Sequence, residues 1–265
     1  MDDEQFRQLL QYLNLSWKGY RKVRKGVKKR IRRHMRQMGC QNMEVYLLEL
    51  EKSDEAKHEC ECLITVSISR FFRDQTLWEI LQKNVLPGLI ENHRDKINIW
   101  LAGCASGEEV YSLKILWNDL AISNDYLPKL EIIATDMNPA CLERARAGIY
   151  SPSSLKEVPE HFRSLFFRAL PGKNLYAVDP SLKSNIIWQI HHLLNDPPKS
   201  LFHLIFLRNN LLTYYEDKLK KTAIIKITEC LSLGGFLIIG SHENLPFETP
   251  DLLPSYSLSY VLKKG

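Results

Sequence analysis

Residues 97–109, INIWLAGCASGEE, and residues 131–139, EIIATDMNP, decide the fold of this 265-residue chain. In the first stretch an apolar run breaks into the small residues 103–107, as a buried strand does when it ends in a tight turn close to a ligand. The second stretch is another apolar run, and it stops at Asp136. An acid at the tip of the second strand of a nucleotide-binding α/β sheet can accept hydrogen bonds from ribose hydroxyls. Together the two stretches predict a site for a small molecule that carries a nucleoside.

The residues after the turn narrow the class of ligand. A phosphate-binding P-loop needs a Lys and a Ser or Thr directly after its last Gly, whereas Gly107 is followed by Glu108 and Glu109. The dinucleotide pattern G-x-G-x-x-G is also absent, because Ala105 occupies its middle position. Two carboxylates beside the turn favour a ligand with positive charge, such as an amine or a sulfonium. An ordinary strand-to-helix turn stays open as the alternative at this point.

The composition indicates a globular protein of a reducing compartment. With 45% hydrophobic residues the chain can bury a sizeable core, and no apolar run approaches the ~20 residues of a membrane helix. The first ten residues, MDDEQFRQLL, lack the apolar centre of a signal peptide. The six cysteines have no framework spacing, so we expect free thiols and a cytoplasmic location.

From about residue 96 the sequence alternates between short apolar runs and helical patterns. This alternation predicts a doubly wound, mostly parallel α/β sheet, in which the last two strands are antiparallel neighbours because their link is too short for a crossover. A turn at 171–174, PGKN, predicts a small antiparallel β insertion near 163–185. The expected strands are residues 97–102, 131–135, 186–192, 203–208, 235–240 and 257–263.

Residues 1–92 are predicted to form an N-terminal helical domain, and residues 93–265 the α/β domain. Val23, Val27, Ile31 and Met35 recur at a spacing of four, which is one face of a helix that Gly39 could end. Further helices are expected at 44–54 and 74–93.

The helix at 18–36 carries a dense basic stripe, with 11 Lys and Arg and no Asp or Glu, whereas the rest of the chain has 25 Lys and Arg against 31 Asp and Glu. Such a stripe predicts an acidic partner, although it could also be a solvated helix face. Because the apolar positions are needed for the core, Arg24, Lys28 and Arg32 are the candidate substrate-binding residues. A nucleic-acid partner is the rival, but recognised RNA-binding signatures are missing.

At this point the motifs resemble those of the CheR-type methyltransferases, which use S-adenosylmethionine to methylate glutamate side chains of chemotaxis receptors. The resemblance covers nearly the whole chain and includes the basic helix with the MGCQNMEVYLLELE that follows it. Its motifs are SISRFFRD (67–74), CASGEEVYSL (104–113), RARAGIYS (144–151), LRNN (207–210) and GSHENLP (240–246), all in the family's order. It implies a Rossmann-like methyltransferase fold, S-adenosylmethionine as cofactor, and an acidic helical segment of a receptor-like protein as partner, without membrane insertion.

The resemblance also implies roles for individual residues. Arg73 matches the arginine near the reacting carboxylate, and the 65–74 segment is expected to contact the cofactor from the N-terminal domain. Asn195 and Asp196 stand where the family has an Asn-Leu pair beside the adenine. The residues expected to contact the cofactor are Ser67, Ser69, Arg73, Gly103, Glu108, Asp136, Met137, Asn195, Asp196, Arg208 and Asn209.

Three positions depart from the family pattern. Ser67 replaces an Asn, and Val110 replaces a Pro. In the stretch 208–214, RNNLLTY, an ungapped match puts Thr213 where the family has an active-site Tyr. Tyr214 is then one residue late and faces elsewhere unless the backbone slips. Thr213 and Tyr214 therefore join Arg73 as candidate catalytic residues.

Several alternatives stay open from the sequence. Arg73 could form a surface ion pair with Asp74 or Glu79, Asp136 could cap the helix that begins near Pro139, and Glu108 could serve the helix dipole. His58, Cys60 and Cys62 lie close together, but no second ligand pair accompanies them, so no metal is expected. The function is a protein-glutamate methyltransferase, a methyltransferase for another substrate, or a cofactor-binding module with reduced catalysis.

Overall fold

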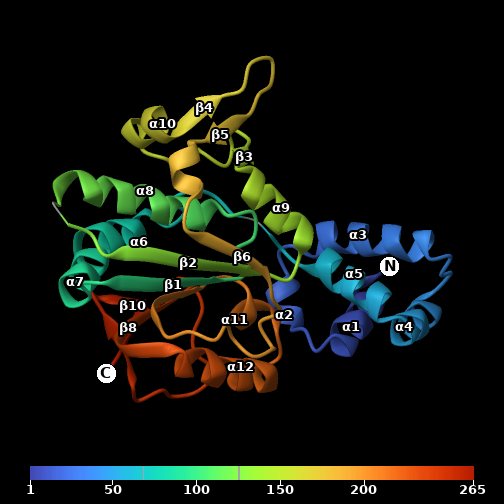
Figure 1. Cartoon of the computed structure of the whole chain (residues 1–265). Helices are drawn as coiled ribbons and strands as arrows, with labels where there is room; N and C mark the ends of the chain where they lie inside the picture. Colours follow the sequence, from blue (N-terminus) through green and yellow to red (C-terminus); the bar gives the residue numbers. More distant parts are fainter. Residues whose placement is uncertain (68, 125) are drawn as a thin grey trace.

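The computed structural model describes residues 1–67, 69–124 and 126–265, and within them a seven-stranded sheet forms the centre of the molecule (Figure 1). The strand order is β6-β2-β1-β7-β8-β10-β9. The first five strands in this order pair in parallel, whereas β10 pairs antiparallel with β8 and β9. The strands are β1 (Lys96–Ala102), β2 (Lys129–Asp136), β6 (Ile186–Ile190), β7 (Phe202–Leu207), β8 (Leu231–Ile239), β9 (Leu252–Ser255) and β10 (Leu258–Lys264).

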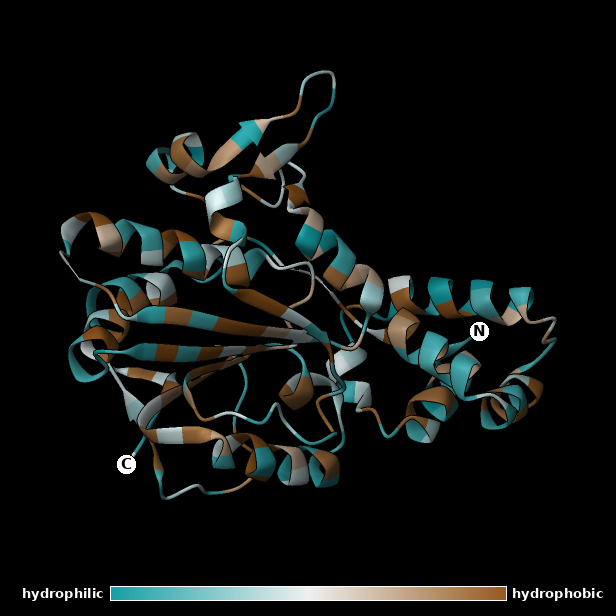
Figure 2. Cartoon of the chain, in the orientation of Figure 1, coloured by the Kyte–Doolittle hydropathy of each residue, from teal (hydrophilic) through white to brown (hydrophobic). Residues whose placement is uncertain are grey.

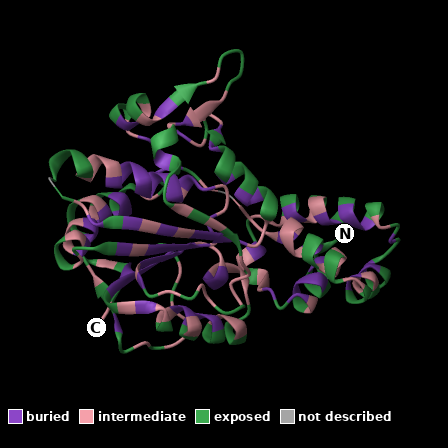
Figure 3. Cartoon of the chain, in the orientation of Figure 1, coloured by how far each residue is buried: buried purple, intermediate pink, exposed green. Residues whose placement is uncertain are grey.

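Helices cover both faces of this sheet, with α8 (Glu108–Ser123) and α9 (Pro139–Ala147) on one face and α12 (Asp217–Glu229) on the other (Figure 1). Parallel strands covered on both faces are buried almost continuously, which explains why β1 and β7 are apolar runs rather than alternating patterns. Figure 3 shows this burial along the centre of the sheet. The predicted fold class, a doubly wound and mostly parallel Rossmann-like sheet, is confirmed, as is the antiparallel pairing of the last two predicted strands.

The edge strand β9 lies in the Pro-rich link between those two strands and was not predicted. Pro254 lacks a backbone N–H, so a strand that contains it is acceptable only at the edge of a sheet, which is where β9 lies. Because of Pro254 this stretch resembles a link between strands, which is why the edge strand was not predicted.

A second, smaller sheet stands apart from the first (Figure 1). It has the order β3 (Ile149–Tyr150), β5 (Tyr176–Val178), β4 (Phe167–Ala169), and all its pairs are antiparallel. The hairpin predicted around the 171–174 turn is present as β4 and β5. Residues 164–166, predicted as strand, instead end the helix α10 (Glu160–Phe166).

Two separate hydrophobic cores divide the chain. The helices α1 (Asp3–Tyr12), α2 (Trp17–Tyr20), α3 (Arg24–Gln37), α4 (Met43–Lys52) and α5 (Asp54–Ile64) share one core, which includes the apolar face of α3. The helices α6 (Gln75–Ile80) and α7 (Leu86–Asn92), joined by a π-helical turn just before Pro87, pack instead into the core of the sheet. We therefore propose that the helical domain ends near residue 64, because a boundary at residue 92 would separate α6 and α7 from their packing partners.

The helical domain docks tightly on α11 (Leu211–Tyr214), the short helix after β7. The backbone N–H of Ser16 donates to the carbonyl of Tyr214 at 2.7 Å, and Leu15 forms a β-bridge with Tyr215. A Cβ atom on Gly19 would lie only 2.2 Å from the carbonyl oxygen of Thr213. A residue with a side chain at position 19 would therefore push the two units apart.

Candidate functional site

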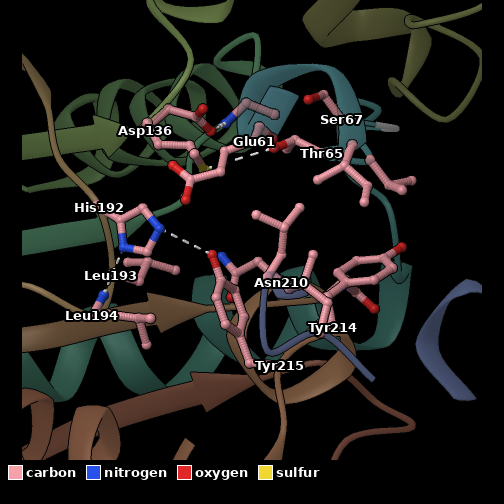
Figure 4. Close-up of a pocket in the computed structure, with 18 of the residues that line it drawn as sticks. Glu61, Thr65, Ser67, Asp136, His192, Leu193, Leu194, Asn210, Tyr214 and Tyr215 are labelled. Atoms are coloured by element: carbon pink, nitrogen blue, oxygen red, sulfur yellow. Dashed lines mark hydrogen bonds between the residues drawn. The ribbon is translucent and has the colours of Figure 1, made fainter. Parts of the chain in front are cut away.

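A cavity of about 330 Å³ lies where the carboxyl ends of β6, β2, β1 and β7 meet the N-terminal helices. The loops after those strands form one side, and the ends of α1 and α5 with residues 65–67 form the other. In Figure 4, Glu61 from α5 and Asp136 from β2 lie across the cavity from Tyr215. Open α/β sheets bind their ligands at this edge, and the volume is typical of a small-molecule site.

Most of the residues predicted from the sequence meet at this cavity, although they come from distant parts of the chain. Those that line it are Ser67, Ser69, Arg73, Gly103, Asp136, Met137, Arg208, Asn209 and Tyr214. Thr213, Glu108, Asn195 and Asp196 are not among the lining residues.

The turn after β1 is held by Asp136. Its carboxylate accepts hydrogen bonds from the backbone N–H groups of Ala105 and Asn138, both at 2.9 Å. Burial raises the pKa of Asp136, and these two backbone hydrogen bonds act in the opposite direction. Gly103 has a φ of +81°, and a Cβ there would lie 2.1 Å from the side-chain nitrogen of Asn210. The small residues of the motif are thus explained by close packing at the turn.

The alternative that Asp136 caps the following helix is not what the structure shows. Asn138 is the N-cap of α9, and its side chain accepts from the N–H of Ala140. Each carboxylate oxygen of Asp136 has one backbone donor and a second lone pair, so both can accept a further hydrogen bond from a ligand in the cavity.

Glu108 begins α8 just behind the cavity wall and is only 5% exposed. Burial raises its pKa, while hydrogen bonds from its own backbone N–H and from the Ser69 hydroxyl lower it. Its Oε2 atom is buried without a hydrogen-bond partner among the described residues. Ser69 of the 65–74 segment therefore lies beside the start of α8, which brings two sequence motifs together.

Arg208 follows β7 and is held by acids from two other elements. Its guanidinium pairs with Glu109 and, at 3.2 Å, with Asp74. Its side chain is 2% exposed, and its Nε is buried without a partner among the described residues. The pair formed with Arg208 offsets the charge of Glu109, so of the two carboxylates after the turn neither stands alone in the cavity.

Arg73 lies on the cavity wall in a strained stretch of backbone. Phe72 and Asp74 on either side of it both have positive φ, at 52° and 72°, as do Ala105 and Asn209 around the same cavity. Left-handed backbone is costly for residues other than glycine, and it concentrates at functional sites. Of the two acids predicted as surface partners of Arg73, Asp74 binds Arg208 and accepts from the Tyr260 hydroxyl, and Glu79 pairs with Lys83.

Tyr214, rather than Thr213, lines the cavity (Figure 4). The Thr213 hydroxyl donates to Glu243, whose carboxylate also accepts from the backbone N–H of Asn209. Burial raises the pKa of Tyr214, the charge of Glu243 adds to this, and Arg73 lowers it. Tyr214 was expected to face elsewhere unless the backbone slips, but it lines the cavity, while the side chain of its neighbour Thr213 binds Glu243.

The loop after β6 contributes different residues from those expected. Asn195 and Asp196 are exposed, and the Asp196 carboxylate pairs with Lys226 at 2.7 Å. The cavity is lined instead by His191–Leu194, directly after the strand. The predicted pair Asn195 and Asp196 therefore does not line the cavity, whereas the end of the strand would have located the stretch that does.

His192 and Tyr215 form a pair in this loop region. The N–H of Leu194 donates to His192 Nδ1, so in the neutral ring Nε2 carries the hydrogen and donates to the Tyr215 oxygen at 3.3 Å. Burial lowers the pKa of His192, which favours that neutral form.

Sequence reasoning also missed Glu61, which extends from α5 into the cavity (Figure 4). Burial raises its pKa, and Lys57 and His58 act in the opposite direction. No motif includes Glu61, because it reaches the site only through the docking of the helical domain.

The helix α3 is hydrophilic over most of its length (Figure 2), and its cations are divided between contacts within the protein and exposure to solvent. Lys28 pairs with Asp3 at 2.8 Å, Arg24 pairs with the same carboxylate at 3.4 Å, and Arg32 donates to the Met1 carbonyl. The three predicted substrate-binding residues thus already contact the start of the chain. The exposed cations of the helix are Lys25, Lys29, Arg32, Arg33 and Arg36.

Two further observations concern the described part of the chain. No helix there is long and apolar enough to cross a membrane. No group of three or more His, Cys, Asp or Glu side chains there is arranged to hold a metal ion, and Cys60 is fully buried in the helical core.

Comparison with known proteins finds relatives of this chain. The family described as "CheR methyltransferase, SAM binding domain" matches residues 67–261. A chemotaxis protein methyltransferase of Listeria monocytogenes is 36% identical over 76% of this chain and 74% of its own length. Chemotaxis protein methyltransferase 1 of Pseudomonas aeruginosa is 33% identical over 69% of each chain. Among solved structures, the N-methyltransferase NodS of Bradyrhizobium japonicum with S-adenosylhomocysteine aligns with a TM-score of 0.35, at 16% identity over 63% of each chain.

The family match begins close to where the sheet core begins and spans every strand that borders the cavity. Relatives above 30% identity extend over at least two thirds of the chain. This chain belongs to the CheR methyltransferase family, and its matched region is an S-adenosylmethionine-binding methyltransferase domain.

Proposed function

We propose that this protein transfers a methyl group from S-adenosylmethionine to glutamate side chains of a chemotaxis-receptor-like protein, giving glutamate methyl esters. The observation that carries the proposal is that Arg73 and Tyr214 lie together on the wall of the cavity that Asp136 also lines. A carboxylate-binding group and a nucleoside-binding group thus share one cavity.

The residues present fit S-adenosylmethionine. Asp136 has lone pairs available for ribose hydroxyls, and the carboxylate of Glu61 in the same cavity is an acceptor that suits a sulfonium or an amine. Leu193 and Leu194 offer an apolar surface for a purine ring. The buried and unpartnered Nε of Arg208 is a donor left for an anionic group. When bound, the cofactor supplies an activated methyl group.

The contribution of the protein to this reaction is mainly to position the reacting carboxylate. A glutamate carboxylate is already ionised near pH 7, so no general base is required. The planar guanidinium of Arg73 can hold such a carboxylate in a fixed orientation, and the hydroxyl of Tyr214 can donate to one of the carboxylate oxygens. Exclusion of water from the cavity then strengthens both contacts.

The placement of Tyr214 and Arg73 in one cavity also helps to distinguish the alternative functions. A cofactor-binding module without catalysis was suggested by Thr213, but a tyrosine does line the cavity beside Arg73. A methyltransferase for another substrate is distinguished only by its product.

We further propose that the exposed basic face of α3 recognises an acidic helical segment of the substrate. Lys25, Lys29 and Arg36 follow helical spacing and lie exposed, whereas Arg24 and Lys28 are already paired with Asp3. Facing charges of opposite sign speed the encounter of two proteins more than they change the chemical step. All six cysteines are free thiols, which fits a cytoplasmic protein.

The experiment is methyl transfer from labelled S-adenosylmethionine to an acidic helical receptor segment, followed by mild base. Methyl esters of glutamate hydrolyse and release the label, which is the expected result. Label that persists in base would indicate N-methylation and a different substrate class. No label at all, with cofactor still bound, would indicate a module without catalysis.

A further inference from the structure

One cation of the basic helix points inward rather than outward. Arg30 lies among the exposed residues of α3, yet its side chain is part-buried and donates to two carbonyls of another element. Its Nε donates to the carbonyl of Leu63 at 2.7 Å, and its Nη2 donates to the carbonyl of Thr65 at 2.9 Å.

These two carbonyls belong to the end of α5. The last carbonyls of an α-helix have no partner within the helix, so they need donors from elsewhere. Arg30 supplies two from one planar group, and a positive charge at this end also complements the helix dipole. The direction in which the chain leaves α5 is thereby fixed.

The chain that leaves α5 at this point is a wall of the cavity. Thr65, Val66 and Ser67 all line it, and the Thr65 hydroxyl contacts the sulfur of Met137 at 3.7 Å. Met137 directly follows Asp136. A series of contacts therefore runs from Arg30 through Thr65 to the loop that carries the predicted ribose acid.

Arg30 also lies near Tyr20: burial raises the pKa of that phenol, and the positive charge of Arg30 acts in the opposite direction. The ring of Tyr20 packs on that of Tyr214 with centroids 4.8 Å apart. Arg30 thus lies beneath both the cofactor segment and the aromatic wall of the cavity.

We propose that Arg30 is a positioning residue for the cofactor-binding segment 65–67 and is not part of the partner-binding face. The inference rests on the proposed use of this cavity by S-adenosylmethionine. It means that α3 has two tasks, because the helix that presents cations to a partner also holds the cofactor wall in place.

The test compares Arg30→Gln with Arg33→Gln in the full chain. The two variants lose the same charge from adjacent turns of one helix, but Arg33 is exposed. Calorimetric titration with S-adenosylhomocysteine should show roughly tenfold weaker binding for Arg30→Gln and less than about twofold change for Arg33→Gln. Arg30→Lys should fall between, because an ammonium can reach one carbonyl but does not bridge two.

A kinetic readout separates this role from a general loss of stability. Arg30→Gln should raise the KM for S-adenosylmethionine and leave the KM for the protein substrate unchanged, at temperatures where circular dichroism shows the variant to be folded. Cofactor affinity equal to the wild type in both folded Arg30 variants would overturn the inference.

Asp136→Ala is the arm that tests the underlying assignment of the cavity. If Asp136→Ala weakens binding and the Arg30 variants do not, only the role of Arg30 is wrong. If neither change affects binding, the cavity is not the cofactor site and both conclusions fall.

Discussion

The exchange of roles between Thr213 and Tyr214 leads to a sharp prediction. Removing only the hydroxyl of Tyr214, as Phe, should lower the rate of methyl transfer while cofactor binding is retained. The ring of Tyr214 packs on Tyr20 at 4.8 Å and its backbone carbonyl accepts from Ser16, so the fold around it does not depend on the hydroxyl.

The magnitude follows from the surroundings of the hydroxyl. Burial raises the pKa of Tyr214, and the charges of Glu243 and Arg73 act on it in opposite directions. A hydrogen bond to a charged group contributes about 1.5–3 kcal/mol. At about 1.4 kcal/mol per factor of ten, Tyr214→Phe should reduce kcat/KM for the protein substrate roughly 10- to 100-fold.

The assay is the initial rate of labelled methyl transfer at saturating S-adenosylmethionine, with calorimetry of S-adenosylhomocysteine as the control for cofactor binding. Thr213→Ser is the matched variant, because it changes the neighbouring side chain but keeps the hydroxyl that donates to Glu243. Thr213→Tyr should fail to raise turnover, since the Thr213 backbone is packed against Gly19 and its side chain points to Glu243. A rate for Tyr214→Phe within about twofold of the wild type would refute the assignment, and gain of activity in Thr213→Tyr would restore the ungapped match.

Three further predictions follow. Asp136→Ala should weaken S-adenosylhomocysteine binding by about 1–3 kcal/mol in calorimetry, because ribose hydroxyls lose an acceptor; unchanged affinity in a folded variant would remove that role. Reversing Lys25, Lys29 and Arg36 to Glu should raise the KM for the protein substrate roughly three- to tenfold at low salt and leave cofactor affinity unchanged. For the unmutated protein, ~1 M salt should have the same effect on the KM as these substitutions. A KM that responds to neither the substitutions nor salt would favour the nucleic-acid partner, which a gel shift would check. Burial raises the folded-state pKa of Glu108 above its ordinary 4.5, so the contribution of this residue to stability is present below that value and lost as pH rises. Glu108→Gln should therefore raise the Tm at pH 7–8 and lose this advantage in acid. An equal gain at all pH values would contradict the sign of this pKa shift.

The sheet was predictable because its strands are continuous apolar runs. Burial on both faces leaves a strong signal in the sequence, as in β1 and β7, and the small residues after β1 mark where a turn packs closely. The edge strand β9 lacked this signal, since an edge strand tolerates Pro254 and exposed residues.

The site was predictable where single motifs carry it and not where distant elements meet. Asp136 and the 103–107 turn can each be predicted from the end of a single strand. Glu61 and Tyr12 reach the cavity only because the helical domain docks through Gly19 onto α11, a contact that no local pattern encodes. The orientation of Tyr214 depends on the hydrogen bond that Thr213 donates to Glu243, a residue 30 positions away in the sequence.

The roles within the basic stripe illustrate the same limit. Composition shows how many cations α3 carries, but not that Arg24 and Lys28 bind Asp3 or that Arg30 binds the end of α5. Those contacts depend on how α1 and α5 pack beside α3, which is a property of the folded core.

The most direct test of the account is a crystal structure of the chain with S-adenosylhomocysteine. We predict density in the cavity between the two units, with the ribose hydroxyls within hydrogen-bond distance of the Asp136 carboxylate and the sulfur on the side of Arg73 and Tyr214. A ligand bound outside this cavity, or one whose ribose lies away from Asp136, would contradict the central claim.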